Sequence, residues 1–140
     1  MEYRLELVIV PVSDVDRAKE FYVDKVGFNL DVDTMPGENF RVVQMTPPGS
    51  ACSVTIGQGL NTKMAPGSVE GLHLVVADIV AARAELAGRG VEINEVFHFE
   101  SGKQVPGPAP DRGDYNSFAD FRDPDGNVWL LQEVGHKAGA

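Results

Sequence analysis

The chain has 140 residues, of which 43% are hydrophobic and 24% charged, and its formal net charge at pH 7 is −9. This composition is typical of a globular domain with a core and excludes a disordered chain. The acidic balance argues against nucleic acid, whose phosphates need Lys and Arg, and mildly favours neutral or cationic partners. Cys52 is the single cysteine, and neither a signal-peptide pattern nor a membrane-length apolar run is present. We therefore expect a cytoplasmic protein without a disulfide that binds neither nucleic acid nor membrane.

The first half of the chain predicts a strand, a helix and three further strands. Residues 5–12 form a short apolar run rich in Val and Ile, which indicates a buried strand. Ser13 and Asp14 can cap a following helix, with Asp16 placed as in a capping box, and Gly27 ends it. Pro-Gly turns then separate three predicted strands at 28–33, 40–46 and 51–57.

The same order of elements begins again after a glycine-containing segment at residues 59–68. Sliding the chain by 64 residues places Asp14 on Asp78 and Ala18 on Ala82, which indicates an internal repeat. The second copy is predicted as a strand at 71–77, a helix at 79–88, a strand at 91–99, an irregular loop at 101–114 and a final hairpin. The fold class predicted is α+β, with one βαβββ module at 1–58, a linker at 59–68, a second module at 69–134 and a tail at 135–140.

The sequence Asp123-Pro124-Asp125-Gly126-Asn127 organises the end of the chain. Pro in the second position and Gly in the fourth predict a tight turn, which joins a strand at 117–121 to a strand at 128–134. A calcium loop would begin similarly, but no Glu stands at its twelfth position. We therefore expect a hairpin here.

The repeated βαβββ unit, together with Asp14-Val15, Phe21-Tyr22, Gly27-Phe28 and the Asp123 to Asn127 turn, resembles the vicinal oxygen chelate superfamily. This superfamily includes glyoxalase I, extradiol dioxygenases, fosfomycin-modifying enzymes and bleomycin-binding resistance proteins. The resemblance extends over about residues 5–134. It implies that each module curls its sheet into half of an open barrel with the helix on the outer face, and that the protein is a homodimer.

In the metal-dependent members, four inward positions hold a divalent ion. The resemblance places these positions on Leu7, Gly71, Leu130 and, less directly, Thr55. Leucine and glycine side chains offer no donor to a metal, so we expect the metal site to be missing and no cofactor to be needed. A register shifted by two residues would instead make His73 itself a metal ligand, and a divalent metal belongs to that alternative.

Strand alternation indicates what lines the cavity if Gly71 points inward. His73, Val75, Leu5, Leu7, Ile9, Val128, Leu130 and Gln132 then share the inner faces, whereas Val8, Val10, Leu74, Val76, Trp129 and Leu131 pack under the helices. A mostly apolar cavity with a few polar groups suits a small organic molecule. The candidate ligand-binding residues are His73, Gln132, Leu130, Leu7, Phe40, Phe97 and Tyr115.

Each candidate also has a purely structural interpretation. His73 can contact ligand or act as a general base, or it can be a histidine satisfied by Gln132 or by water. Tyr115 and its loop can close over the cavity or remain solvated. Phe40 and Phe97 can stack on a planar ligand or belong to the core.

These features predict a metal-independent small-molecule binding protein that resembles the bleomycin-resistance branch. Its ligand would be a hydrophobic or aromatic molecule, such as a bleomycin- or enediyne-type antibiotic, and its role would be sequestration and resistance. No catalytic residue is assigned. The alternative is an enzyme, either a glyoxalase I-like lyase or a dioxygenase-type metalloenzyme.

Overall fold

The computed structural model describes residues 1–137, so the end of the predicted tail, 138–140, lies outside the described residues. The chain forms two compact units. The first unit contains residues 1–69 and also 123–127, and the second contains residues 70–122 and those after 127. The turn of the final hairpin therefore belongs to the first unit, whereas its two strands belong to the second.

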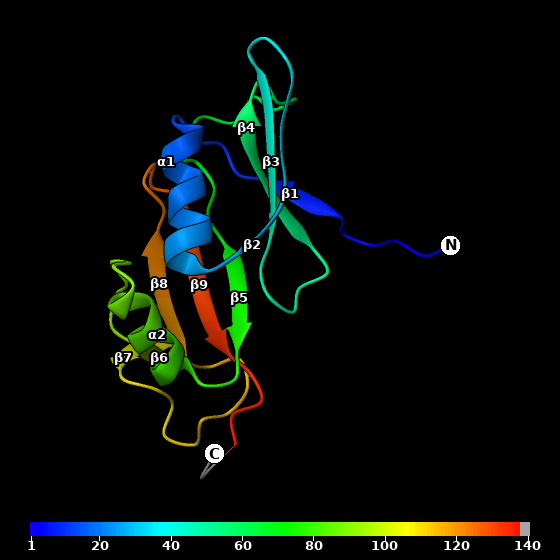
Figure 1. Ribbon diagram of the computed structural model, residues 1–140. Helices are drawn as coiled ribbons and strands as arrows, with labels where there is room; N and C mark the ends of the chain where they lie inside the picture. The colour runs from blue at the N-terminus through cyan, green and yellow to red at the C-terminus, as the bar shows by residue number, and fades with distance from the viewer. Residues whose placement is uncertain (138–140) are drawn as a thin grey trace. The chain divides into compact units, whose positions relative to one another are not determined.

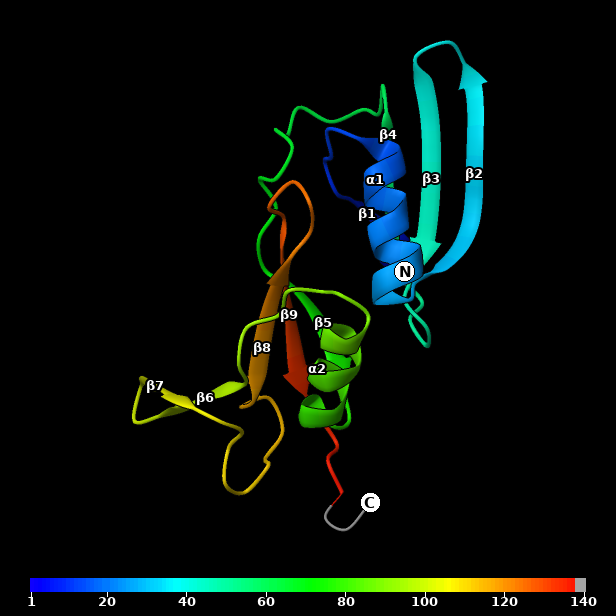
Figure 2. The same ribbon diagram turned by 60° about the vertical axis from the view of Figure 1, so that its left-hand side comes forward.

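The first unit is a four-stranded mixed sheet with a helix on one face (Figure 1). The strand order is β1-β4-β3-β2, and β1 runs parallel to β4. The helix packs against this sheet in both views (Figure 2) and buries apolar side chains of both layers. The elements are β1 (Leu7–Ile9), α1 (Val15–Lys19), η1 (Glu20–Val26), β2 (Asn29–Gly37), β3 (Phe40–Thr46) and β4 (Ser53–Gln58).

The start and end of the first helix differ in detail from the sequence prediction. Asp14 caps it by accepting a hydrogen bond from the backbone N–H of Arg17 at 3.1 Å. Ser13 instead donates from its hydroxyl to Asp125 at 2.5 Å, so the predicted capping box is wrong. The second half, η1, is a π-helix, for which the sequence gives no signal, and Gly27 ends it with a left-handed φ of 94° that suits glycine.

The second unit is a five-stranded mixed sheet with order β5-β9-β8-β6-β7 and one helix. As in the first unit, its first and last strands, β5 and β9, are parallel neighbours. Asp78 caps α2 by accepting from the N–H of Ala81 at 3.1 Å, which matches the cap made by Asp14. The elements are β5 (Leu72–Val76), α2 (Ile79–Gly88), β6 (Phe97–Glu100), β7 (Lys103–Pro106), β8 (Phe118–Arg122) and β9 (Val128–Glu133).

Two predictions for this unit are wrong. The expected strand at 91–99 is reduced to β6, and Ile93 makes only an isolated bridge to Phe121. The loop expected to be irregular contains β7, which pairs with β6 as an antiparallel hairpin. The second module is therefore βαββββ rather than βαβββ.

The buried side chains follow the predicted strand alternation. Val10, Trp129 and Leu131 are buried on the helix-covered faces of their own sheets. The two mixed sheets, each with a helix on one face, confirm the α+β prediction with two modules, and neither sheet closes into a barrel over residues 1–137. Among these residues, no helix is long and apolar enough to cross a membrane.

The Asp123 to Asn127 turn is the predicted hairpin turn and a buried polar centre of the first unit. The Gly126 N–H donates to the carbonyl oxygen of Asp123 at 3.0 Å, which closes the turn. The buried Asp123 carboxylate accepts from the Tyr22 hydroxyl at 2.7 Å and from the Asn127 side-chain amide at 2.7 Å. Asn127 also donates to the carbonyl oxygen of Pro11 at 2.9 Å, so the turn is tied to the strand-helix connection of this unit.

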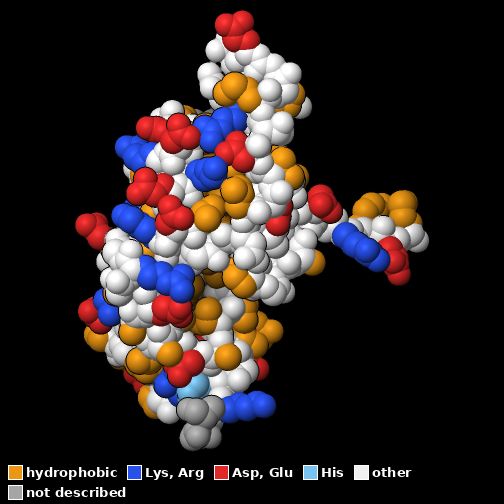
Figure 3. All heavy atoms as spheres, viewed as in Figure 1, with side chains coloured by type: hydrophobic (Ala, Val, Ile, Leu, Met, Phe, Trp, Pro, Cys, Tyr) orange, Lys and Arg blue, Asp and Glu red, His pale blue; other side chains and the backbone are white. Residues whose placement is uncertain are grey.

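Acidic and basic side chains intermix over the surface of α1 (Figure 3). Asp33 of β2 pairs with Arg41 at 3.0 Å and with Lys19 at 2.7 Å. These hydrogen bonds, first from Arg41 and then from Lys19, lower the pKa of Asp33 to about 2. This network lies on the helix side of the sheet and holds α1 to β2 and β3.

Candidate functional site

The face of the second sheet opposite α2 is lined by aromatic and apolar side chains. Register places Val75, Gln132, Phe118 and Phe97 in one row across four strands. A second row crosses three strands through His73, Leu130 and Asp120. Phe99 follows Phe97 by two residues and lies on the same side. We call the surface formed by these eight residues the aromatic face.

Three phenylalanines form the centre of this face. The rings of Phe97 and Phe118 are stacked with centroids 5.5 Å apart and planes at 26°. Phe99 meets both rings edge-on, at 5.8 Å from Phe97 and 5.7 Å from Phe118. Phe97 and Phe118 are half-buried and Phe99 is 42% exposed, so the cluster presents aromatic surface rather than a closed core.

Polar groups stand at the margin of the aromatic face. Nδ1 of His73 lies 2.8 Å from the carbonyl oxygen of Gly71, and the side chain is exposed. The partner of Nδ1 of His73 is therefore a backbone carbonyl rather than the Gln132 side chain, which is one of the two partners expected from the sequence. The Gln132 side-chain amide donates to the carbonyl oxygen of Tyr115 at 3.3 Å, and Tyr115 has a left-handed φ of 67°. Tyr115 is exposed next to the end of β9, and this contact ties its loop to the same face.

Of the predicted ligand-binding residues, His73, Leu130, Gln132 and Phe97 come together on the aromatic face, and Tyr115 borders it. Leu7 and Phe40 belong to the sheet of the first unit, where Leu7 lies opposite Ser53 and Phe40 begins β3. The face that carries Leu7 is more polar. Thr46 and Ser53 bond to each other through their hydroxyls at 2.8 Å, and the buried hydroxyl of Thr55 has no hydrogen-bond partner among the described residues.

Sequence reasoning missed Phe118 and Asp120 as members of the face. Both lie on β8, and each is placed by its pairing with β9, where Phe118 faces Gln132 and Asp120 faces Leu130. Strand alternation predicts that these two side chains share a face, but only the pairing of β8 with β9 shows that this face is the one that holds Leu130 and Gln132.

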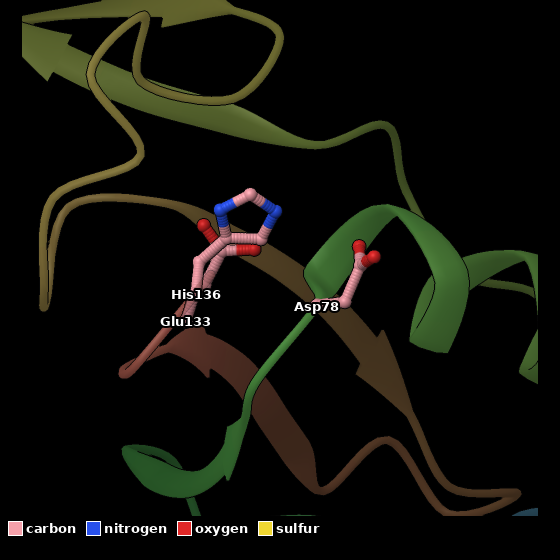
Figure 4. Close-up of side chains that lie close together, drawn as sticks. All are labelled: Asp78, Glu133 and His136. Atoms are coloured by element: carbon pink, nitrogen blue, oxygen red, sulfur yellow. The ribbon is translucent and has the colours of Figure 1, made fainter. Parts of the chain in front are cut away.

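A separate group of possible metal ligands lies at the start of α2. Figure 4 shows Asp78, Glu133 and His136 directed toward one another, and their candidate donor atoms lie within 4.8 Å of one another. Arg112 already supplies the positive charge there. Its guanidinium donates to both oxygens of the fully buried Glu133, at 2.8 Å and 2.6 Å, and reaches Asp78 at 3.3 Å.

The remaining bonds of this cluster are structural. Glu133 also accepts from the N–H of Ile79 at 2.8 Å, in the first turn of α2. The hydrogen bond from Arg112 is the main cause that holds the pKa of Glu133 below its ordinary value, against the opposing effect of burial. Because a divalent ion would have to displace Arg112, these residues fit an ion-paired anchor of α2 better than a metal site.

The positions at which the resemblance implies a metal do not fit one. Leu7 and Leu130 are half-buried apolar side chains, and Gly71 is an exposed glycine with φ of 86°. Thr55 offers a single hydroxyl. Divalent ions in such sites need imidazole, carboxylate or thiolate donors, and none of these four residues carries one.

Comparison with known proteins adds four findings. The profile of the Glyoxalase/Bleomycin resistance protein/Dioxygenase superfamily matches residues 4–131. The chain is 36% identical to TnmS3, an antibiotic binding protein from Streptomyces sp. CB03234, with a TM-score of 0.74 over 94% of this chain and 96% of that one. A glyoxalase/bleomycin resistance protein from the same organism is 37% identical, with a TM-score of 0.70 over 92% of this chain and 99% of that one. The protein YetH of Bacillus subtilis (strain 168) is 28% identical over 126 residues, which is 90% of this chain and 94% of YetH.

Proposed function

Because the chain belongs to the Glyoxalase/Bleomycin resistance protein/Dioxygenase superfamily, we propose that it is a small-molecule binding protein that sequesters a planar aromatic natural product. The observation that carries the proposal is the cluster of Phe97, Phe99 and Phe118, which presents ring surface on the aromatic face. Offset and edge-on contacts of this kind contribute about 0.5–1.5 kcal/mol per aromatic pair beyond area burial. The similarity to an antibiotic binding protein supports the same assignment.

Binding by this face would need no metal. The rings offer stacking, Leu130 and Val75 offer apolar contact, and the His73 and Gln132 side chains offer hydrogen bonds at the margin. The family's metal positions carry no suitable donors, and the Arg112 guanidinium already pairs with Glu133 and Asp78. We therefore propose a metal-independent binder without a catalytic residue, acting as a cytoplasmic homodimer in resistance to bleomycin- or enediyne-type compounds.

A thermal-shift screen tests the proposal. The panel contains a glycopeptide of the bleomycin type, an enediyne and simple anthraquinones, because these differ in charge and size but share planar rings. A ligand at 100 times its Kd stabilises the protein by about 2.7 kcal/mol. We expect at least one aromatic member of the panel to raise Tm in a concentration-dependent way, and no shift across the panel would contradict the proposal.

Matched variants locate the site. Phe118→Leu keeps an apolar side chain on the aromatic face but removes the ring that stacks on Phe97. Phe40→Leu makes the same change on β3 of the first unit, where the ring is 40% exposed. We expect Phe118→Leu to weaken binding of the panel hit about tenfold and Phe40→Leu to leave it unchanged. Equal losses in the two variants would place the site elsewhere.

The enzyme alternative has a direct test. A glyoxalase I-like lyase or a dioxygenase would require a divalent metal, so protein purified without chelator should then contain one equivalent of Ni, Zn, Fe or Mn. A metal-free enzyme would depend on His73 as the general base, and His73→Ala would abolish turnover while preserving binding. We expect neither result.

A further inference from the structure

A pocket of about 390 Å³ lies at one end of the aromatic face, within the second unit. Phe97 and Asp120 both line this pocket, together with Val96 and Pro106. The remaining lining residues are Asn94, Glu95 and Gln104. The pocket therefore joins an aromatic ring and a carboxylate within one small volume.

Asp120 is a half-buried carboxylate without a cationic partner among residues 1–137. Asn94 orients it, since the Asn94 side-chain amide donates to Oδ2 of Asp120 at 3.0 Å. The backbone N–H of Asn94 also donates to the carbonyl oxygen of Asp120 at 2.9 Å. Within the described part of the chain no side chain donates to Oδ1, so this oxygen can accept another donor. The second acid of the pocket, Glu95, is already paired with Arg83 at 3.2 Å.

We propose that this pocket binds the protonated amine of an aromatic ligand, with Asp120 as the residue that selects for positive charge. The inference rests on the proposed function and names the chemical class of its ligand. A half-buried carboxylate without a counter-ion gains a charge-assisted hydrogen bond from an ammonium group. The same cation lies against the face of Phe97, which adds a cation–π attraction, while the ligand's rings extend over Phe118 and Phe99.

Two dyes with the same ring system separate the contribution of charge from that of stacking. At a pH of about 7.5, 9-aminoacridine is a cation and acridine is uncharged, and the Kd of each is measured by fluorescence titration. We expect wild-type protein to bind 9-aminoacridine about tenfold more tightly than acridine. Raising the salt concentration should narrow this difference.

Substitutions test whether the preference for the cationic dye arises in this pocket. Asp120→Asn removes the charge and keeps an acceptor for Asn94, so we expect it to weaken 9-aminoacridine binding about tenfold without affecting acridine. Asp24→Asn is the matched control, since Asp24 is an exposed residue of the first unit whose replacement changes net charge equally. Gln104→Glu adds a carboxylate to the lining at an exposed position, and should strengthen binding of the cation about threefold.

The outcomes distinguish this inference from the proposed function. If both dyes bind wild type with equal affinity, and Asp120→Asn and Gln104→Glu change neither, the charge-selective pocket is overturned while aromatic binding stands. If neither dye binds and the antibiotic panel also gives no Tm shift, both proposals are overturned. Should Asp120→Asn fold poorly, as seen from its own melting curve, Gln104→Glu alone decides the question.

Discussion

The two units repeat one plan and differ on one face of the sheet. In both, the first strand runs parallel to the last, and an Asp at equivalent positions, Asp14 and Asp78, caps the helix with a 3.1 Å bond. Opposite the helix, the first sheet carries the hydroxyls of Thr46, Ser53 and Thr55, whereas the second carries a phenylalanine cluster. The two units therefore share their strand pairing and helix cap, whereas the side chains on the sheet face opposite the helix differ. Packing against the helix does not constrain that face, so its residues can serve ligand binding.

The units also bury a carboxylate differently. In the first unit, Asp123 is held by neutral donors, namely the Tyr22 hydroxyl and the side-chain and backbone N–H groups of Asn127. In the second unit, Glu133 is held by the Arg112 guanidinium. Removing a neutral donor costs about 1 kcal/mol, whereas separating a buried ion pair costs more because a charge is left uncompensated. Three predictions test this contrast, and a fourth tests the difference between the sheet faces.

The largest effect is expected from Glu133→Gln. The substitution keeps an acceptor for the N–H of Ile79 but removes the buried anion of the Arg112 guanidinium, which keeps only the 3.3 Å contact with Asp78 among the described residues. We expect the free energy of unfolding in urea to fall by about 2–3 kcal/mol. Glu95→Gln is the control, because it breaks the exposed ion pair with Arg83 and should change the free energy of unfolding little. Similar losses of stability in the two variants would show that the buried pair stabilises the protein no more than the exposed one.

The same pair predicts a pH dependence with a defined sign. Arg112 holds the pKa of Glu133 below its ordinary value of 4.5, so the stabilisation is complete above pH 4.5 and is lost as pH falls through the depressed value. The stability difference between wild type and Glu133→Gln should therefore be constant from neutral pH down to about 5 and shrink at lower pH.

In the first unit, the pKa of Asp33 is lowered in the same direction, from its ordinary value of 3.8 to about 2, so the stabilisation by its ion pairs is lost as pH falls through about 2. Carbon NMR titration of the Asp33 carboxyl group can measure this pKa.

A smaller effect is expected from Tyr22→Phe in the first unit. The variant removes the 2.7 Å bond to Asp123 but leaves this carboxylate with the donors from Asn127 and the N–H of Asp125. We expect a loss of about 1 kcal/mol in urea unfolding. Tyr3→Phe, at an exposed position, is the control and should have no effect. A loss of stability as large as that of Glu133→Gln would show that the neutral donors around Asp123 stabilise the protein as much as the ion pair of Glu133 does.

The sequence predicted the regular elements best where local signals were strong. The helix Ile79–Gly88 and the strand Phe40–Thr46 have the expected bounds, because a cap, a terminal glycine or flanking turns mark their ends. The strand Lys103–Pro106 was missed, since its Gly- and Pro-rich surroundings indicate a loop and it is held only by pairing with β6 at the sheet edge.

The residues of the aromatic face could be predicted in part, chiefly where they lie on one strand. Alternation along a strand placed Leu130 and Gln132 on one face, and pairing with β5 placed His73 beside them. Phe118 and Asp120 required the register between β8 and β9, and Asn94 joined Asp120 from an irregular segment with no local signal. Side chains that meet through strand register or loop packing are set by tertiary contacts, which a single sequence does not specify.

The smallest effect, and the one of opposite sign, is expected from Thr55→Val in the first unit. The buried Thr55 hydroxyl has no hydrogen-bond partner within residues 1–137, so its removal relieves a desolvation cost and loses no hydrogen bond there. We expect the free energy of unfolding to stay unchanged or to rise by up to about 1 kcal/mol. Thr46→Val is the control, because the Thr46 hydroxyl donates to the Asp31 carboxylate and contacts the Ser53 hydroxyl at 2.8 Å, so its loss should destabilise by about 1 kcal/mol or more. If Thr55→Val is as destabilising as Thr46→Val, the Thr55 hydroxyl has a hydrogen-bond partner in solution, such as a water molecule, and its burial then carries no uncompensated desolvation cost.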